Sequence, residues 1–156
     1  MTDGPVPVPD IRFSHTVIAV SDMDRALAFY RGVLGMDVVF DQMISAAGFD
    51  TRTVGGALGG ISLELLLVPN ESRDEPSASK RSRGGLQLIS FSVPDVDETY
   101  TAITAAVGDR AQPPFDVDKV RMFFVTDPDG TVVEFVEFPN GARNPAEFHR
   151  NSQGGE

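Results

Sequence analysis

The 156-residue chain is long enough to bury one substantial hydrophobic core and short enough to form a single domain. Its net charge of -10, from 13 Lys and Arg against 23 Asp and Glu, opposes contact with phosphate backbones and anionic lipid, so we expect neither nucleic acid nor a membrane as a partner. The chain has no cysteine, which excludes disulfides and thiolate chemistry and leaves His, Asp and Glu as the strong candidate metal ligands.

The first half of the chain has the pattern of a strand, a helix and three further strands. Residues 1–10 are rich in proline and predict an extended arm; they have neither a basic start nor an apolar run, and we expect a cytoplasmic protein. The apolar, β-branched run at 13–20 predicts a buried strand. Asp22 is a natural N-cap for the helix that follows, and Gly35 favours the end of that helix. Three more strands are expected over 36–42, 49–54 and 61–68.

The second half repeats this pattern after a polar segment, 69–84, which has almost no apolar side chain and predicts a solvated linker. A strand is expected over 86–93, and a helix from Val96 to just before Gly108. V-S-D-M-D at 20–24 aligns with V-P-D-V-D at 93–97 with an offset of 73. Later strands are expected over 120–126 and 131–138, joined by the turn D-P-D-G.

Two copies of one β-α-β-β-β unit predict an α+β fold in a single domain, 11–138, with module one over 11–68 and module two over 85–138. Residues 139–156 are then a C-terminal tail. Neither unit buries its sheet alone, so we expect the two to pair into a curved mixed sheet with the helices on its outer face. The inner, concave face then forms a ligand cleft.

Strand alternation predicts which side chains reach that cleft. Ile18 and Val20 must face the helix, which turns His15 toward the inner face. The same reasoning places Glu64 and Glu134 there, so three ionisable groups are expected on one concave surface. The other residues expected to line the pocket are Val17, Ser62, Leu88, Ser90 and Phe124.

Four motifs give the chain its resemblance to the vicinal oxygen chelate superfamily, which includes glyoxalases, bleomycin-resistance proteins and extradiol dioxygenases. The motifs are H-x-V-x-x-V-x-D at 15–22, A-F-Y-R-G-V-L-G at 28–35, L-E-L at 63–65 and F-x-x-D-P-D-G-x-x-x-E at 124–134. In the metal-bearing members of this family, four ligands come from the first and last strands of each module. Those positions fall here on His15, Glu64, Leu88 and Glu134.

Leu88 departs from the family pattern, because leucine offers no lone pair. A bulge that turns Gln87 inward is one way to replace it; otherwise His15, Glu64 and Glu134 remain as ligands. Such a set suits Zn, Ni, Co, Mn or Fe(II) with open positions for substrate oxygens.

The resemblance then implies a metal-assisted isomerase, epimerase or lyase acting on a small oxygenated metabolite, with Glu64 or Glu134 as the base, in a homodimer. The alternative, left open by Leu88, is a metal-free protein that sequesters an antibiotic or natural product. The sequence does not decide between an enzyme and a binding protein.

Three further side chains have chemistry that a site can use. His149, in the tail, is either a surface imidazole or a substitute for the ligand that Leu88 lacks. Arg121 and Arg143 are candidate clamps for an anionic substrate, although a solvated surface charge is the more common role of an arginine.

Overall fold

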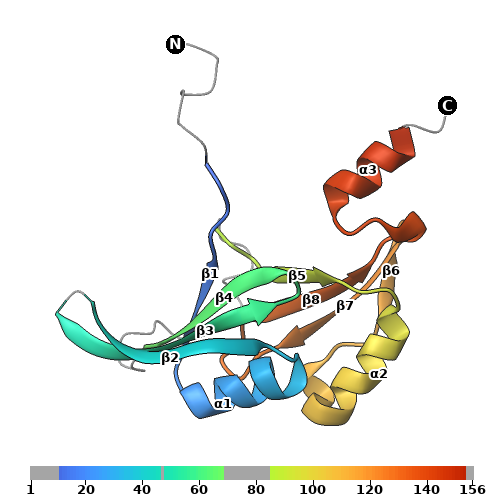
Figure 1. Ribbon diagram of the computed structural model, residues 1–156. Coiled ribbons are helices and arrows are strands. Elements are labelled where there is room, and N and C mark those ends of the chain that lie inside the picture. Colours follow the sequence, from blue (N-terminus) through green and yellow to red (C-terminus); the bar gives the residue numbers. More distant parts are fainter. Residues whose placement is uncertain (1–10, 47, 69–84, 154–156) are drawn as a thin grey trace.

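The computed structural model describes residues 11–46, 48–68 and 85–153 (Figure 1). The arm expected over 1–10 and the linker expected over 69–84 therefore lie outside the described residues. The elements of the first module are β1 (Thr16–Val20), α1 (Met23–Leu27), η1 (Ala28–Val33), β2 (Asp37–Ala46), β3 (Phe49–Leu58) and β4 (Ile61–Leu67). Helix α1 continues directly into η1, a π-helix, and Gly35 follows in the left-handed conformation (φ 78°) that was expected there.

The second module repeats this order. Its elements are β5 (Ile89–Ser92), α2 (Val96–Val107), the short 3₁₀-helix η4 (Gly108–Arg110), β6 (Phe115–Val117), β7 (Val120–Thr126) and β8 (Val132–Glu137). The chain then continues through η5 (Pro139–Gly141) into helix α3 (Pro145–Gln153). The duplicated β-α-β-β-β unit is thereby confirmed.

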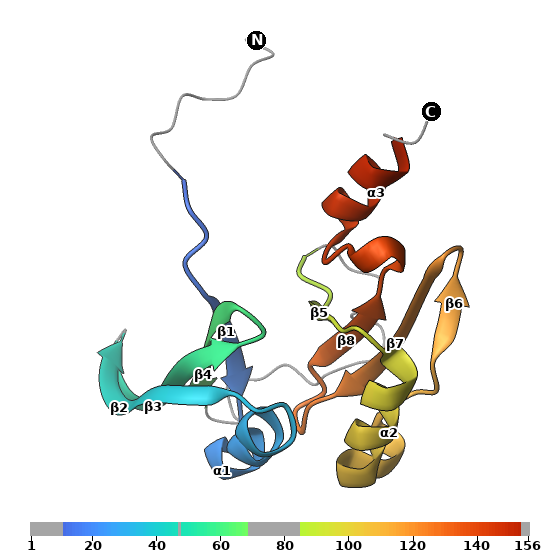
Figure 2. The ribbon, with the colours of Figure 1, turned by 45° about the vertical axis from the view of Figure 1, so that its right-hand side comes forward.

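Each module forms a four-stranded mixed sheet, with strand orders β1-β4-β3-β2 and β5-β8-β7-β6. In each sheet the first strand runs parallel to the last, with Val17 opposite Glu64 in one and Ser90 opposite Glu134 in the other. Figure 2 shows α1 and α2 together on one side of the two sheets. We call the sheet face that packs on the helix of its own module the outer face, and the opposite one the inner face.

The hydrophobic core lies between the outer faces and the helices. Leu63 and Leu65 are fully buried, and each contributes roughly 2–3 kcal/mol by leaving water. Residues between them in the strand, such as Glu64, remain partly exposed on the inner face. This alternation confirms the two-residue period on which the sequence interpretation depended. One contiguous core spans both modules, and its fully buried side chains include Val20, Phe29, Tyr30, Val54, Val96, Phe123, Val125 and Val133.

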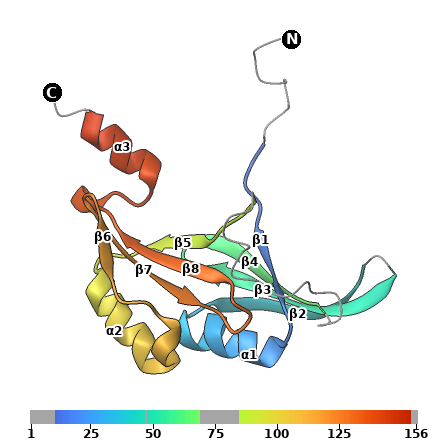
Figure 3. The same ribbon diagram turned by 180° about the vertical axis from the view of Figure 1, so that it is seen from behind.

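The two modules are joined by the turn between β7 and β8, which lies against the first module (Figure 3). The Tyr30 hydroxyl donates a 2.8 Å hydrogen bond to Asp127, which is 2% exposed. Asp127 also accepts from the backbone N–H groups of Asp129 and Thr131. The Ser21 backbone N–H donates to Asp129 at 2.9 Å. Burial, and secondarily the Asp127 carboxylate, raise the pKa of Tyr30, so its hydroxyl stays protonated and keeps donating.

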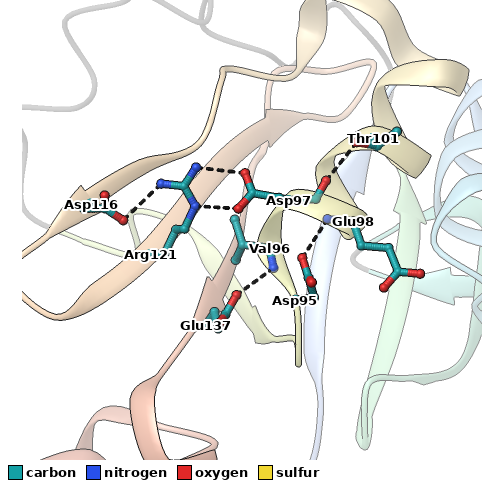
Figure 4. Close-up of polar contacts among 8 residues, drawn as sticks. All are labelled: Asp95, Val96, Asp97, Glu98, Thr101, Asp116, Arg121 and Glu137. Atoms are coloured by element: carbon teal, nitrogen blue, oxygen red, sulfur yellow. Dashed lines mark hydrogen bonds and ion pairs between the residues drawn. The ribbon is translucent and has the colours of Figure 1, made fainter.

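An arginine in each module ties the outer face of the sheet to the helix. In the second module, Arg121 donates two hydrogen bonds of 2.8 Å to Asp97 of α2 and one of 3.0 Å to Asp116 of β6 (Figure 4). In the first module, Arg52 lies 3.8 Å from Asp24 of α1 and donates two hydrogen bonds to Asp41 of β2. We call these two groups the arginine clamps.

The helix starts also repeat. Asp22 accepts from the Arg25 N–H at α1, as the capping motif predicted, and Asp95 accepts from the Glu98 N–H at α2. At α2 the Val96 N–H also donates to Glu137 of β8, as Figure 4 shows. Because Asp24 and Asp97 follow these caps by two residues, the repeated V-x-D-x-D motif encodes both the helix cap and the carboxylate of the clamp.

Some boundaries differ from those expected. Strands β2 and β3 form a longer hairpin than the strands expected over 36–42 and 49–54, because their pairing continues from Asp37 to Ala46. Strand β6, which the repeated unit requires but which was not located in the sequence, is only three residues long and gives a weak periodic signal. The tail folds in part, since Phe148 of α3 packs on Phe138 with ring centroids 5.8 Å apart. Among the described helices, none combines the length and apolar character needed to cross a membrane.

Candidate functional site

An imidazole and a carboxylate meet at the parallel edge of the first sheet. His15 immediately precedes β1, and Glu64 lies in β4 opposite Val17. The His15 Nε2 atom is 3.6 Å from Glu64 Oε2, with 43% and 23% of the two side chains exposed. The Ser14 hydroxyl lies 2.8 Å from His15 Nδ1. Ser14 therefore fixes one ring nitrogen and leaves Nε2 directed at the carboxylate.

A buried threonine holds the other oxygen of Glu64. Thr53 lies in β3 opposite Leu66, and only 1% of it is exposed. Its hydroxyl donates a 2.6 Å hydrogen bond to Glu64 Oε1. Because a buried hydroxyl has few rotamers, this bond restricts the carboxylate and turns Oε2 toward His15. The sequence reasoning missed Thr53, although it lies in the strand expected over 49–54, because the register of that strand against β4 was unknown.

The second module carries an equivalent carboxylate with different neighbours. Glu134 of β8 lies opposite Ser90, whose hydroxyl donates a 2.7 Å hydrogen bond to Glu134 Oε1. Leu88 immediately precedes β5, as His15 precedes β1, so the offset of 73 is confirmed in three dimensions. Leu88 is half-buried and has no donor atom. Gln87 donates to the Gly85 carbonyl oxygen.

The structure brings His15 and Glu64 together but does not bring Glu134 to them. Within the described residues, no group of three or more His, Cys, Asp or Glu side chains is close enough to hold one metal ion. The two carboxylates lie in different sheets. A site that uses all three residues therefore needs the inner faces of two chains, or a closer approach of the two modules.

The residues expected to line the pocket have the inner-face positions that the alternation predicted. Val17 is 45% exposed, and Ser62 and Ser90 are also exposed. Phe124 lies opposite Glu134 on β7, with its ring centroid 5.6 Å from that of Phe115. A further aromatic residue, Phe40, lies over Gly55: a Cβ added at Gly55 would be 2.2 Å from the Phe40 Cζ atom. Phe40 lay within the strand expected over 36–42, but its position over Gly55 depends on the register of β2 against β3, which the sequence did not reveal.

The other candidate side chains lie away from this pair. Arg121 is held by Asp97 and Asp116 on the outer face, so it is a structural clamp (Figure 4). Arg143 lies at the start of α3, 4.0 Å from Glu147. His149 is exposed on α3, with its ring centroid 5.1 Å from that of Phe148.

Comparison with known proteins gives the family of the chain. Residues 12–135 match the sequence profile of the Glyoxalase/Bleomycin resistance protein/Dioxygenase superfamily. A lactoylglutathione lyase from Haemophilus influenzae is 30% identical over 126 residues, which cover 79% of this chain and 90% of that protein.

Two solved structures show the same fold. One is TnmS3, an antibiotic binding protein from Streptomyces sp. CB03234, with a TM-score of 0.61, 22% identity, and 84% of this chain and 98% of that one covered. The other is FosX, a fosfomycin resistance protein from Listeria monocytogenes, in complex with Mn(II) and sulfate, with a TM-score of 0.60, 15% identity, and coverage of 83% and 93%. The profile match and the duplicated fold together show that this chain belongs to the Glyoxalase/Bleomycin resistance protein/Dioxygenase superfamily.

Proposed function

We propose that this protein is a glyoxalase-like, metal-assisted isomerase, epimerase or lyase that acts on a small metabolite with two neighbouring oxygen atoms. The observation that carries this proposal is the pairing of His15 Nε2 with Glu64 Oε2 at 3.6 Å on the inner face. An oriented imidazole beside a restrained carboxylate is a donor pair that suits Zn, Ni, Co, Mn or Fe(II). The similarity to a lactoylglutathione lyase and to a structure that holds Mn(II) supports the same chemistry.

The donor set fits a metal ion in part. His15 and Glu64 supply two ligands, and Leu88 supplies none. We therefore propose that Glu134 of a second copy completes the site in a homodimer, because the described part of one chain does not gather three ligands. Two-fold symmetry would then form two equal sites, each between the first module of one chain and the second module of the other.

A bound ion would supply Lewis-acid stabilisation of negative charge on the two substrate oxygens. The remaining work belongs to the side chains. Thr53 and Ser90 each hold one oxygen of a carboxylate, which prevents Glu64 and Glu134 from rotating away from the substrate. The second oxygen of Glu134 then serves as a ligand or takes a proton from the substrate carbon. Val17 and Leu66 add apolar surface on the inner face, which favours proton transfer by excluding water.

Metal titration of single-histidine variants tests the proposal. The chain has only two histidines, so His149→Ala is a matched control for His15→Ala. With Mn²⁺ or Zn²⁺ in a calorimeter, we expect about a 100-fold loss of affinity for His15→Ala and no change for His149→Ala. Equal affinities in the wild type and His15→Ala would contradict the metal site.

Mixed dimers test whether two chains share each site. His15→Ala damages the first module of one chain, and Glu134→Gln damages the second module of the other. A shared site predicts that each variant alone binds little metal, whereas a refolded equimolar mixture regains about a quarter of the wild-type sites, because half of its dimers carry one intact site. A site within one chain predicts no recovery.

The second candidate function is a metal-free binding protein, favoured by Leu88 at a ligand position and by the fold shared with an antibiotic binding protein. It predicts that no divalent ion co-purifies with the protein in chelator-free buffer and that small-molecule binding is the same before and after EDTA treatment. The enzyme predicts a stoichiometric ion that disappears in His15→Ala.

A further inference from the structure

A row of residues crosses the inner face of the first sheet and places an aromatic ring beside the carboxylate. Val17, Glu64, Gly55 and Phe40 lie opposite one another, in that order, on β1, β4, β3 and β2. The Phe40 ring covers Gly55, since Cζ and Cε1 lie 2.2 and 2.4 Å from where a Cβ of residue 55 would be. Only glycine allows this approach. The ring therefore reaches from β2 over β3, about one strand spacing (~4.8 Å) from the strand that carries Glu64.

The second module also has an aromatic ring beside its inner carboxylate, but this ring comes from a different strand position. Phe124 itself lies opposite Glu134, in the position that corresponds to Gly55. Its ring packs against Phe115, which is 38% exposed on the same face. Phe40 is 36% exposed. Both modules thus set a partly exposed phenyl ring beside the inner carboxylate, although the rings come from different strand positions.

In the part of the chain that the structure describes, no strand places a basic side chain on an inner face. The eight strands of the described residues contain two basic residues, Arg52 and Arg121, and both are on outer faces in the arginine clamps. Glu64 and Glu134 therefore give the strand surface of the site a negative character, in a chain whose net charge is -10. With no metal ion bound, this surface disfavours an anionic ligand and accepts an uncharged or cationic one.

From these observations we infer that the site selects a ligand with a planar, unsaturated ring and, in the metal-free protein, no net negative charge. The ring stacks on Phe40 while the adjacent oxygens of the ligand lie at His15 and Glu64. The position of the oxygens rests on the proposed function; the choice of ring and charge does not.

Three matched probes separate ring, shape and charge. 2-Hydroxyacetophenone has a planar ring and neighbouring oxygens, 1-cyclohexyl-2-hydroxyethanone replaces the planar ring with a saturated one, and mandelate keeps the ring but adds a negative charge. With the wild-type protein kept metal-free by EDTA, calorimetry or ligand-observed NMR should show 2-hydroxyacetophenone binding roughly threefold to tenfold more tightly than either of the others. A preference for mandelate, equal binding of all three, or no binding of 2-hydroxyacetophenone would overturn the inference.

Two variants test Phe40 by independent routes. Phe40→Leu keeps an apolar side chain but removes the ring, and Gly55→Ala keeps the ring but displaces it from the sheet. Both should reduce the preference for the planar ring to within about twofold. Val39→Ala, which changes the adjacent residue (73% exposed), is the matched control and should keep the full preference. An unchanged preference in Phe40→Leu would overturn the role of the ring.

The His15→Ala variant separates this inference from the proposed function. If it weakens binding of all three probes equally while the ring preference remains, both proposals stand. If the ring preference is found but His15→Ala changes nothing, the ring inference stands and the oxygen site fails. If His15→Ala weakens binding of probes that show no ring or charge preference, the oxygen site stands and the inference fails.

Discussion

The outer faces of the two modules are nearly copies of each other, whereas their inner faces have diverged. On the outer face, Asp24 and Asp97 occupy the same step after a helix cap, and each contacts the arginine of its own sheet. On the inner face, His15 of the first module corresponds to Leu88 of the second. Both modules pack a helix on the outer face of a sheet, so the residues that make this contact repeat. The inner face carries chemistry, and there one half supplies an imidazole and the other an apolar wall.

The contrast between the modules also concerns how each carboxylate is held. Thr53, which is buried, holds Glu64 from the neighbouring antiparallel strand, and Ser90, which is exposed, holds Glu134 from the parallel strand. Glu64 is therefore the more restrained of the two. This difference agrees with different roles for the two modules, in which the first module positions the ligand and the second completes the site.

The largest expected effect on stability comes from breaking the contact between the β7–β8 turn and the first module. Asp127→Ala removes the acceptor for the Tyr30 hydroxyl and for two backbone N–H groups in a buried turn. We expect the free energy of unfolding to fall by about 3 kcal/mol, measured by urea denaturation. Tyr30→Phe, which removes one of these bonds, should cost about 1 kcal/mol. A similar loss in both variants would show that Asp127 acts only through Tyr30.

A second experiment makes the second module resemble the first. Leu88→His places an imidazole one residue before β5, where His15 stands before β1. We expect the affinity for Zn²⁺ to rise about tenfold, because a fourth donor enters the set. Leu88→Gln is the control, because it adds a polar side chain at position 88 but no imidazole. If neither variant binds metal more tightly, position 88 does not reach the ligand site.

Removing the restraint on Glu64 should have a smaller effect. Thr53→Val keeps the shape of the buried side chain and deletes the hydroxyl that donates to Glu64. We expect metal affinity to fall by roughly threefold to tenfold, measured by the same calorimetric titration. Ser90→Ala, the equivalent change at Glu134, should lower it less, because Ser90 is exposed and water can replace its hydroxyl. A larger loss of metal affinity in Ser90→Ala than in Thr53→Val would contradict the roles assigned to the two modules.

The smallest expected effect concerns the arginine clamps. The hydrogen bond from Arg121, aided by its charge and opposed by desolvation, holds the pKa of Asp97 below its usual value. This contribution to stability is therefore present above the unfolded pKa of about 4 and disappears as the pH falls through the lower folded pKa. Asp97→Asn should slightly lower Tm at pH 7 and leave it unchanged at the acidic end. Asp24→Asn, at the longer 3.8 Å contact, should change Tm less.

Much of the fold could be predicted because it depends on local patterns. Strand alternation placed Leu63 and Leu65 on the buried side and Glu64 on the other, and the offset of 73 aligned His15 with Leu88. The strand β6 and the long hairpin of β2 and β3 could not be predicted in the same way. Their pairing depends on partners far along the chain, and their own alternation is short or mixed.

The sequence by itself determined the duplicated architecture, the cap of the first helix and the inner position of His15, Glu64 and Glu134, because two-residue and 3.6-residue periods follow from the backbone. Only the tertiary structure decided which of these groups meet. It paired His15 with Glu64, kept Glu134 in the other sheet, and laid Phe40 over Gly55. These contacts depend on strand order, register and the packing of one module against the other, which no local pattern encodes.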